Sequence, residues 1–263
     1  MSYMLQKESY DKHGFVVIPG LLRGDELAEL RQNLDRYVRD VVPHLPSTDA
    51  FYHDRRRPET LKQLHRMQCD PYFSDYAKHP KWTVLGEALT GEPGAAQSME
   101  WFNKPPATNH VTPPHQDNYY FCLTPARVVT IWLALDPVDT ENGCLRYVSG
   151  SHLCGFREHA KSKVLGFSQG ITSYSPNDFG REVAVPLQPG DAVAHHSMTI
   201  HRADANTSQT RQRRSLAMVF RGTSCHRDEK AFARYQATAR EQLEETNQQS
   251  ESGPDLYPEA KRR

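Results

Sequence analysis

The residues of this chain best suited to metal chemistry are two histidines and one aspartate. The segment TPPHQDNYYF contains His115 and Asp117, separated by a single residue. A mononuclear iron site that activates oxygen uses two neutral imidazoles and one carboxylate on one face of the metal, which leaves the opposite positions open. On or beside a strand, residues i and i+2 point to the same side, so this pair can supply two of the three ligands. The third ligand must then come from a distant strand.

The segment PGDAVAHHSMTIHRADANTS offers three candidates for that third ligand. His195 and His196 lie inside an apolar strand pattern, which favours packing in the core. His201 lies just past the strand, toward a polar turn, and follows His115 by 86 residues, a spacing that lets non-adjacent strands of a barrel converge. We therefore predict that His115, Asp117 and His201 meet at one metal position, with the other two histidines outside it.

A second His-x-Asp triplet serves as a control for the first. His226 and Asp228 open a stretch of helical propensity, in which Asp228 has an ordinary role as a helix N-cap or first-turn acid. No histidine follows this triplet that could complete a metal site. We predict that His226 also lies outside the metal position.

An arginine is expected near such a site if the co-substrate is a dicarboxylic keto acid, because the far carboxylate needs a planar, permanently charged partner. The segment RQRRSL contains three candidates, Arg211, Arg213 and Arg214. Strand alternation groups Arg211 and Arg213 with Ser215 and Ala217, small residues that suit an interior face. A solvated basic cluster at a strand end is the alternative interpretation.

The elements that position these residues differ between the two parts of the chain. Residues 1–94 are predicted to be mostly helical support, with a buried strand in GFVVIPGLL. A helix capped by Asp25 is predicted from apolar residues at three- and four-residue steps, and shorter helical patterns cover residues 59–69 and 80–91. Gly91 and Pro93 are typical of a helix end.

Residues 95–222 read as strands, because the apolar period shortens toward two and β-branched and aromatic residues increase. Short strands without alternating helices favour an antiparallel sandwich or barrel, so the fold class is mainly β with flanking helices. The stretch 155–180 is too long and polar for an ordinary connection, and we predict a lid-like insertion there. Residues 223–263 are predicted to form a helical and loosely ordered tail, which makes one domain over residues 1–263.

Composition excludes several classes of function. The chain has 263 residues, 32 Lys+Arg and 32 Asp+Glu, so its zero net charge removes the usual reason to expect nucleic-acid binding. No apolar run is long enough to cross a membrane, and the start has no apolar secretory region. Five irregularly spaced cysteines disfavour a disulfide framework or a cysteine zinc site. A globular, cytoplasmic protein with a small-molecule substrate is the expectation.

An ordered run of motifs resembles the phytanoyl-CoA dioxygenase family of iron(II)- and 2-oxoglutarate-dependent oxygenases. The motifs are QSM at 97–99, PPHQD at 113–117, IWLAL, ENGCLRYVSGSH at 141–152, PGDAVAHHSMTIH at 189–201, NTS at 206–208 and RQRRS at 211–215. The resemblance implies a double-stranded β-helix (jelly-roll) core behind the N-terminal helical layer. It implies iron bound by His115, Asp117 and His201, with 2-oxoglutarate and O₂ as co-substrates. The residues implied in binding 2-oxoglutarate are Arg213, Trp132, Met99, Gln116 and Lys62.

The resemblance also implies a reaction, the hydroxylation of an unactivated C–H bond with release of succinate and CO₂. Related halogenases carry Ala or Gly at the position of Asp117, so the carboxylate here favours hydroxylation. Two departures stand out: one extra residue between His201 and Arg213, and Ala203 where the family commonly has a small hydroxyl residue. A non-catalytic metal or 2-oxoglutarate binding module and a zinc hydrolase with the same three ligands are the alternative functions.

Overall fold

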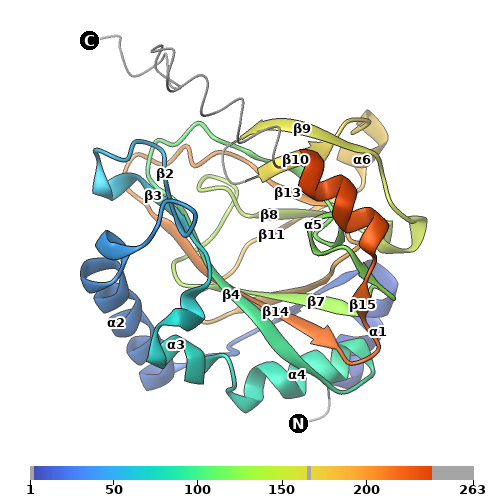
Figure 1. The fold of residues 1–263 in the computed structure, drawn as a ribbon, viewed down its shortest axis with the longest axis horizontal. Coiled ribbons are helices and arrows are strands. Elements are labelled where there is room, and N and C mark those ends of the chain that lie inside the picture. Colours follow the sequence, from blue (N-terminus) through green and yellow to red (C-terminus); the bar gives the residue numbers. More distant parts are fainter. Residues whose placement is uncertain (1–2, 165–166, 239–263) are drawn as a thin grey trace.

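Two antiparallel sheets form the centre of the molecule, which the computed structural model describes over residues 3–164 and 167–238 (Figure 1). Within these residues the larger sheet has seven strands, in the spatial order β1 (Phe15–Ile18), β12 (Ala192–His196), β7 (Val128–Ala134), β14 (Arg213–Gly222), β4 (Gly94–Lys104), β3 (Leu61–Leu64) and β2 (Ala50–Tyr52). The smaller sheet has four strands, in the order β11 (Glu182–Val185), β8 (Leu145–Val148), β13 (His201–Ala203) and β5 (Thr112–His115).

One hydrophobic cluster fills the space between the two sheets. Alternate residues of the large sheet, among them Trp132 on β7 and Ala217 on β14, pack in this cluster against Tyr147 and Leu145 of the small sheet. The pairing registers explain this placement, because Trp132 and Ala217 are direct partners on neighbouring strands and therefore share a face. The inner face of the large sheet therefore forms one side of any site that lies between the two sheets.

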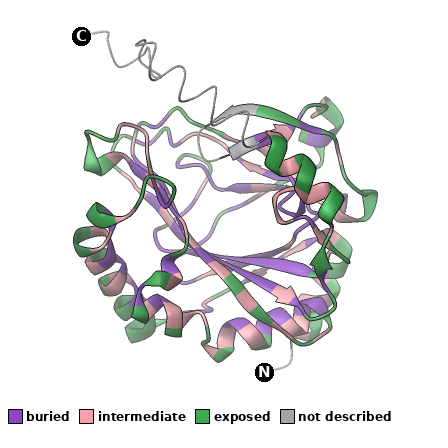
Figure 2. Ribbon diagram, in the orientation of Figure 1, coloured by how far each residue is buried: buried purple, intermediate pink, exposed green. Residues whose placement is uncertain are grey.

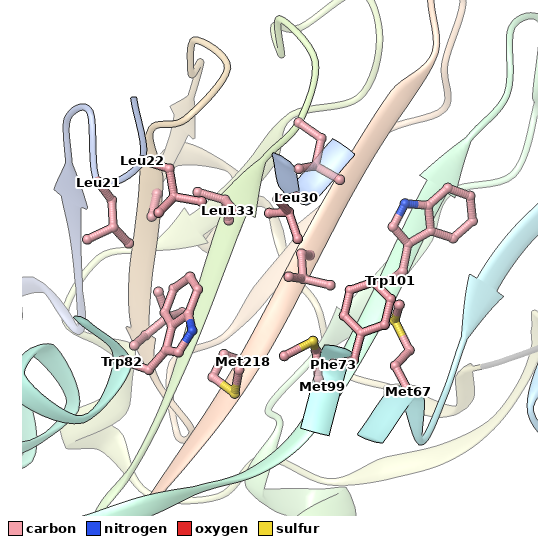
Figure 3. Close-up of a cluster of buried hydrophobic side chains, with 14 of the residues drawn as sticks. Leu21, Leu22, Leu30, Met67, Phe73, Trp82, Met99, Trp101, Leu133 and Met218 are labelled. Atoms are coloured by element: carbon pink, nitrogen blue, oxygen red, sulfur yellow. The ribbon is translucent and has the colours of Figure 1, made fainter. Parts of the chain in front are cut away.

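A second and larger cluster lies on the other face of the large sheet, which the N-terminal helices cover (Figure 2). These helices are α1 (Met4–His13), α2 (Gly24–Asp40), α3 (Pro71–Tyr76) and α4 (Pro80–Thr90). Figure 3 shows Leu30 of α2, Phe73 of α3 and Trp82 of α4 against sheet residues such as Leu133 and Met218. Helix α2 buries the predicted apolar stripe, and Asp25 lies in its first turn instead of capping it. The predicted helix end at Gly91 is confirmed by its left-handed backbone, with φ of 77°.

The predicted helix at residues 59–69 is wrong. These residues form a short 3-10 turn (Pro58–Thr60), strand β3 and a second 3-10 turn (Met67–Cys69). Leu61, Leu64 and Met67 are all buried in the helix-side cluster, and their spacing of three residues imitates a helical pattern. Strand β3 instead pairs with β4, where Gln63 lies opposite Phe102, and this pairing outweighs the local helical pattern.

The predicted insertion at residues 155–180 has secondary structure of its own. It contains a hairpin of β9 (His159–Val164) and β10 (Phe167–Ile171), followed by helix α6 (Pro176–Gly180). Three further elements lie outside the two main sheets: helix α5 (Asn118–Phe121) and the paired short strands β6 (Leu123–Thr124) and β15 (His226–Arg227).

The predicted C-terminal helix is described over residues 229–238, and the remainder of the predicted tail lies outside the described residues. Asp228 accepts hydrogen bonds from the backbone N–H groups of Lys230 and Ala231, which confirms its predicted role at the helix start. Over the described residues, no helix has the length and apolar character needed to span a membrane.

Candidate metal and co-substrate site

Strand pairing brings together the two histidines that sequence analysis selected. His115 ends β5 and His201 begins β13, and the two residues are direct partners in this antiparallel pair. Asp117 follows two residues after His115, where the backbone has already turned into the helical conformation that starts α5. One donor atom from each of His115, Asp117 and His201 lies within 4.8 Å of the other two. The strand-to-helix turn, and not strand alternation, therefore directs the carboxylate toward the imidazoles.

Backbone carbonyls orient both imidazoles. Nδ1 of His115 donates to the carbonyl oxygen of Pro113 at 2.8 Å, and Nδ1 of His201 donates to that of Thr199 at 3.1 Å. With the proton on Nδ1, the lone pair of each ring lies on Nε2, which is the arrangement that a metal ligand requires. Burial, and then the neighbouring imidazole of His115, lower the pKa of His201 well below its usual value, which favours the uncharged ring that a metal ligand needs.

The two oxygens of Asp117 have different surroundings. Oδ1 lies 3.4 Å from Nε2 of His115 and 3.5 Å from Nε2 of His201. Oδ2 accepts hydrogen bonds from the Thr130 hydroxyl at 2.7 Å and from Nε2 of His195 at 3.0 Å. Burial acts to raise the pKa of Asp117, but the surrounding imidazoles, His201 foremost, hold it well below the usual range. The carboxylate is therefore charged, and one oxygen is left to face the imidazoles.

His195 is a residue whose role the sequence analysis missed. It lies outside the group of three donors, but it contacts Asp117 directly instead of only packing in the core. Its neighbour His196 points away, toward the rings of Tyr10 and His152, and His226 lies in the exposed strand β15. Strand alternation was the signal in the sequence that could have revealed this role. On β12, His195 shares a face with Val193, which packs between the sheets.

The three candidate arginines have different partners. Arg211 precedes β14, is partly exposed, and forms two hydrogen bonds with Asp139, at 2.7 and 2.8 Å. Arg214 forms a similar pair with Asp136, at 3.0 and 2.8 Å. The alternation that placed Arg211 inside with Arg213 is therefore wrong, because the strand begins only at Arg213. Both Arg211 and Arg214 have their charge satisfied by a carboxylate.

Arg213 is buried and has no such partner. Its side chain lies between the sheets with 4% of the residue exposed, and its guanidinium carbon lies 5.4 Å from the centre of the Trp132 ring. Among the described residues no carboxylate lies within ion-pair distance of it, and its buried Nε has no hydrogen-bond partner. Burial lowers the pKa of Arg213 to about 10, so the side chain is still charged at neutral pH. A buried unpaired guanidinium is costly unless a ligand neutralises it.

A lysine that sequence analysis did not select lies beside this arginine. Lys104 on β4 is the direct partner of Arg213 on β14, and 6% of the residue is exposed. Its Nζ donates to the carbonyl oxygen of His110 at 2.7 Å. Burial, and then the charges of Arg213 and Lys62, lower the pKa of Lys104 well below its usual value. Burial also lowers the pKa of Lys62 to about 8. The three side chains form a cationic region that suits an anion.

The family model for phytanoyl-CoA dioxygenase (PhyH) matches residues 10–215, more than half of the chain. This chain belongs to that family. The peroxisomal phytanoyl-CoA dioxygenase of Mus musculus is 28% identical over 238 residues, which cover 84% of this chain and 68% of the mouse protein.

Two solved structures extend the comparison. One is the non-heme alpha ketoglutarate dependent carbocyclase SnoK from nogalamycin biosynthesis, with 25% identity, a TM-score of 0.68, and coverage of 85% of this chain and 86% of that one. The other is EvdO2 from Micromonospora carbonacea var. aurantiaca complexed with 2-oxoglutarate, with 26% identity, a TM-score of 0.65, and coverage of 82% and 89%. The predicted jelly-roll core behind a helical layer is confirmed as the fold of this phytanoyl-CoA dioxygenase family member.

Two co-substrate contacts implied by the family resemblance are wrong. Met99 lies in the helix-side cluster, where Figure 3 shows it near Phe73 and Met218. The face of β4 that looks between the sheets carries Phe102 instead. The side chain of Gln116 is occupied by the backbone: its amide donates to the carbonyls of Gly155 and Met198, and its oxygen accepts from the N–H of Arg157. Gln116 therefore ties the site to the start of the insertion.

The other implied contacts, Trp132 and Lys62, lie near the buried cations. Trp132 packs between the sheets beside Arg213, and Lys62 lies near enough to Lys104 to influence its pKa. Lys62 belongs to strand β3 and not to the helix predicted over residues 59–69. Ala203 is fully buried in the cluster between the sheets and offers no hydroxyl group.

Aromatic side chains connect the three donors to the insertion and to the C-terminal helix. The ring of Tyr120 meets His115 edge-on at 5.7 Å and Tyr235 of the C-terminal helix at 5.9 Å. Its hydroxyl donates to the backbone carbonyl of Gln169 on β10. Tyr119 stacks on His159 of β9, with ring centres 4.1 Å apart. The hairpin and this helix therefore border the site.

Proposed function

We propose that this protein is an iron(II)- and 2-oxoglutarate-dependent oxygenase that hydroxylates a C–H bond of a small molecule. The reaction consumes 2-oxoglutarate and O₂ and releases succinate and CO₂. Membership of the phytanoyl-CoA dioxygenase family supports this proposal, as do the two solved relatives described with alpha ketoglutarate or 2-oxoglutarate. The proposed cytoplasmic location rests on sequence alone, and the mouse relative is named as peroxisomal.

Iron(II) fits the donor set of the site. Two neutral imidazole nitrogens and one carboxylate oxygen are the ligands of non-haem iron oxygenases, whose remaining positions stay open. His115 and His201 would bind the metal through Nε2, and Asp117 through Oδ1, since these are the atoms that face one another. When bound, iron supplies the activation of O₂, while the protein fixes geometry and excludes water.

The observation that carries the proposal is the buried, unpaired charge of Arg213. A dicarboxylic keto acid has one end that chelates a metal and a distal carboxylate that needs a charge-assisted partner. Arg213 offers a planar guanidinium for a two-pronged hydrogen bond, and Lys104 adds a second cation opposite it. Trp132 and the apolar cluster between the sheets keep water away from this end of the site, which strengthens the interaction.

The insertion would close over the substrate. Tyr119 and Tyr120 follow the metal-binding segment directly and contact the β9–β10 hairpin, so the hairpin is coupled to the ligand end of the site. Closure of such a segment would exclude water from the reacting C–H bond. The substrate lies on this side because the opposite end is occupied by Arg213, Lys104 and the distal carboxylate that they bind.

The alternatives fit the site less well. A zinc hydrolase would use the same three donors, but it has no need for an unpaired buried arginine. A binding module without catalysis would keep Arg213 but produce no succinate. Hydroxylation is preferred to halogenation because Asp117 is present to fill the position that a halide would take.

Binding of two keto acids tests the proposal. The protein is loaded with Mn(II) under anaerobic conditions and titrated with 2-oxoglutarate or with 2-oxobutyrate, which has the same chelating end but lacks the distal carboxylate. We expect 2-oxobutyrate to bind about 10- to 150-fold more weakly, as the loss of a charge-assisted interaction implies. Equal affinities would remove the role of Arg213, and absence of binding by both would contradict the proposed function.

A further inference from the structure

A buried chain of hydrogen bonds continues from Asp117 away from the metal position. His195 on β12 places Nε2 at 3.0 Å from Oδ2 of Asp117 and Nδ1 at 2.9 Å from the hydroxyl of Tyr147 on β8. His195 is 2% exposed and Tyr147 is fully buried. Both rings also lie against His201, with ring centres 4.5 and 5.6 Å away. The pair therefore lies between the large and small sheets, directly behind two of the proposed ligands.

The direction of each hydrogen bond follows from the chemistry of the partners. A charged carboxylate only accepts, so Nε2 of His195 carries the proton and donates it to Asp117. With Nε2 as the donor to Asp117, the other nitrogen, Nδ1, lies in position to accept from the hydroxyl of Tyr147. Burial raises the pKa of Tyr147 well above its usual value, which keeps this hydroxyl protonated.

These hydrogen bonds give the two oxygens of Asp117 different roles. Oδ2 receives two donors, the Thr130 hydroxyl and Nε2 of His195, which leaves it little capacity to approach a metal. Oδ1 faces both proposed imidazole ligands, at 3.4 Å from Nε2 of His115 and 3.5 Å from Nε2 of His201. Carboxylates bind metals through one oxygen or through both, and hydrogen bonds from outside the ligand set decide between these modes.

We propose that the Tyr147–His195 pair is a positioning device that restricts Asp117 to a single metal–oxygen bond. A six-coordinate metal with three protein ligands keeps three exchangeable positions, two for the chelating end of 2-oxoglutarate and one for O₂. A carboxylate bound through both oxygens would take one of these three. This inference rests on the proposed function for its consequence, but the bonding mode itself is a property of the protein–metal complex alone.

The test counts water molecules on Mn(II) bound to the protein without co-substrate, by water-proton relaxation. His195→Phe removes the hydrogen bonds of His195 to Asp117 and Tyr147 and keeps the bond from Thr130. We expect it to lower the relaxivity by about one third, because one of three waters is lost. His195→Gln keeps a donor near the position of Nε2, so it should restore the wild-type value. Tyr147→Phe removes only the outer bond and should give a smaller decrease. His196→Phe is the matched control, since that ring points away from the site.

The outcomes separate this inference from the proposed function. If His195→Phe has the relaxivity of wild type while it binds Mn(II), the positioning role is overturned. Loss of Mn(II) binding in His195→Phe with a wild-type water count in Tyr147→Phe would also overturn it, since the bond from Tyr147 orients His195. Failure of the wild-type Mn(II) complex to bind 2-oxoglutarate would contradict the proposed function without changing the water count. A decrease in His195→Phe that His195→Gln reverses supports the inference.

Discussion

Arg213 and Lys104 lie directly opposite each other on β14 and β4, and both are buried between the sheets. Direct antiparallel partners place their side chains about 5 Å apart at Cβ, so two cations share a space without an acidic partner among the described residues. Such an arrangement costs stability in the empty protein and becomes favourable when a dianion binds. Under the proposed function, the distal carboxylate of 2-oxoglutarate would bind here and relieve the repulsion between the two side chains.

Replacing Lys104 by Met should separate these two effects. The Lys104→Met variant keeps the length of the side chain and removes one of the two cations. The free energy of unfolding of the protein without ligand should therefore increase by about 1 kcal/mol. Its affinity for 2-oxoglutarate should fall about tenfold, the equivalent of a weakened charge-assisted contact. Thermal unfolding and 2-oxoglutarate titration measure the two quantities. A variant that is less stable and binds 2-oxoglutarate normally would show that Lys104 is purely structural.

The two His-x-Asp triplets should respond differently to the same substitution. Asp117→Ala removes the single anionic ligand and should abolish metal-dependent 2-oxoglutarate turnover. Asp228→Ala removes the acceptor at the start of the C-terminal helix, so it should cost about 1 kcal/mol of stability at most and leave turnover intact. Succinate assays on both variants provide the comparison. Equal loss of activity in the two variants would mean that the wrong triplet was chosen.

His196 should make stability depend on pH in the acidic range. Burial, and then the charge of His152, lower the pKa of His196 from 6.5 to about 4, so the folded protein holds this imidazole neutral. Between these two values the unfolded chain binds the proton and the folded one does not, so stability is lost as the pH falls from 6.5 toward 4. Relative to neutral pH, the loss from this residue should reach about 2 kcal/mol at pH 4.5.

Replacement of this histidine should flatten the pH profile. We expect urea unfolding of His196→Phe to show a smaller decrease between pH 6.5 and 4 than unfolding of the wild type. His226→Phe is the control, since that residue is exposed in β15. A parallel profile for His196→Phe and wild type would assign the acid sensitivity to other groups.

The sequence was sufficient to select the three donors that the structure brings together, His115, Asp117 and His201, and for a physical reason. A short His-x-Asp segment and a histidine at the border of a later strand are local patterns, and antiparallel pairing of β5 with β13 is enough to join them. His195 could not be recognised in this way. Its role depends on which face of β12 looks toward Asp117, and the adjacent pair His195 and His196 places one imidazole on each face.

The mistakes about Met99 and Lys104 arose because the sequence does not show which face of a strand a residue occupies or which residue it pairs with. Met99 and Phe102 lie on opposite faces of β4, so a motif match that is correct in order can still select a side chain on the wrong face. The same uncertainty hid Lys104, whose position opposite Arg213 depends on pairing between strands more than a hundred residues apart. The helix predicted at residues 59–69 failed because Leu61 and Leu64 fit a helical spacing and a short, irregularly paired strand equally well.

Formation of succinate by the three arginine variants tests the central claim most directly. Wild type, Arg211→Lys, Arg213→Lys and Arg214→Lys are assayed with iron(II), ascorbate and increasing 2-oxoglutarate. Lysine keeps the charge but loses the two-pronged hydrogen bond, so Arg213→Lys should raise the KM for 2-oxoglutarate about 10- to 150-fold with nearly unchanged iron affinity. The other two variants should resemble wild type, because their arginines face Asp139 and Asp136. A wild-type KM in Arg213→Lys, or no succinate from the wild-type protein, would contradict the account.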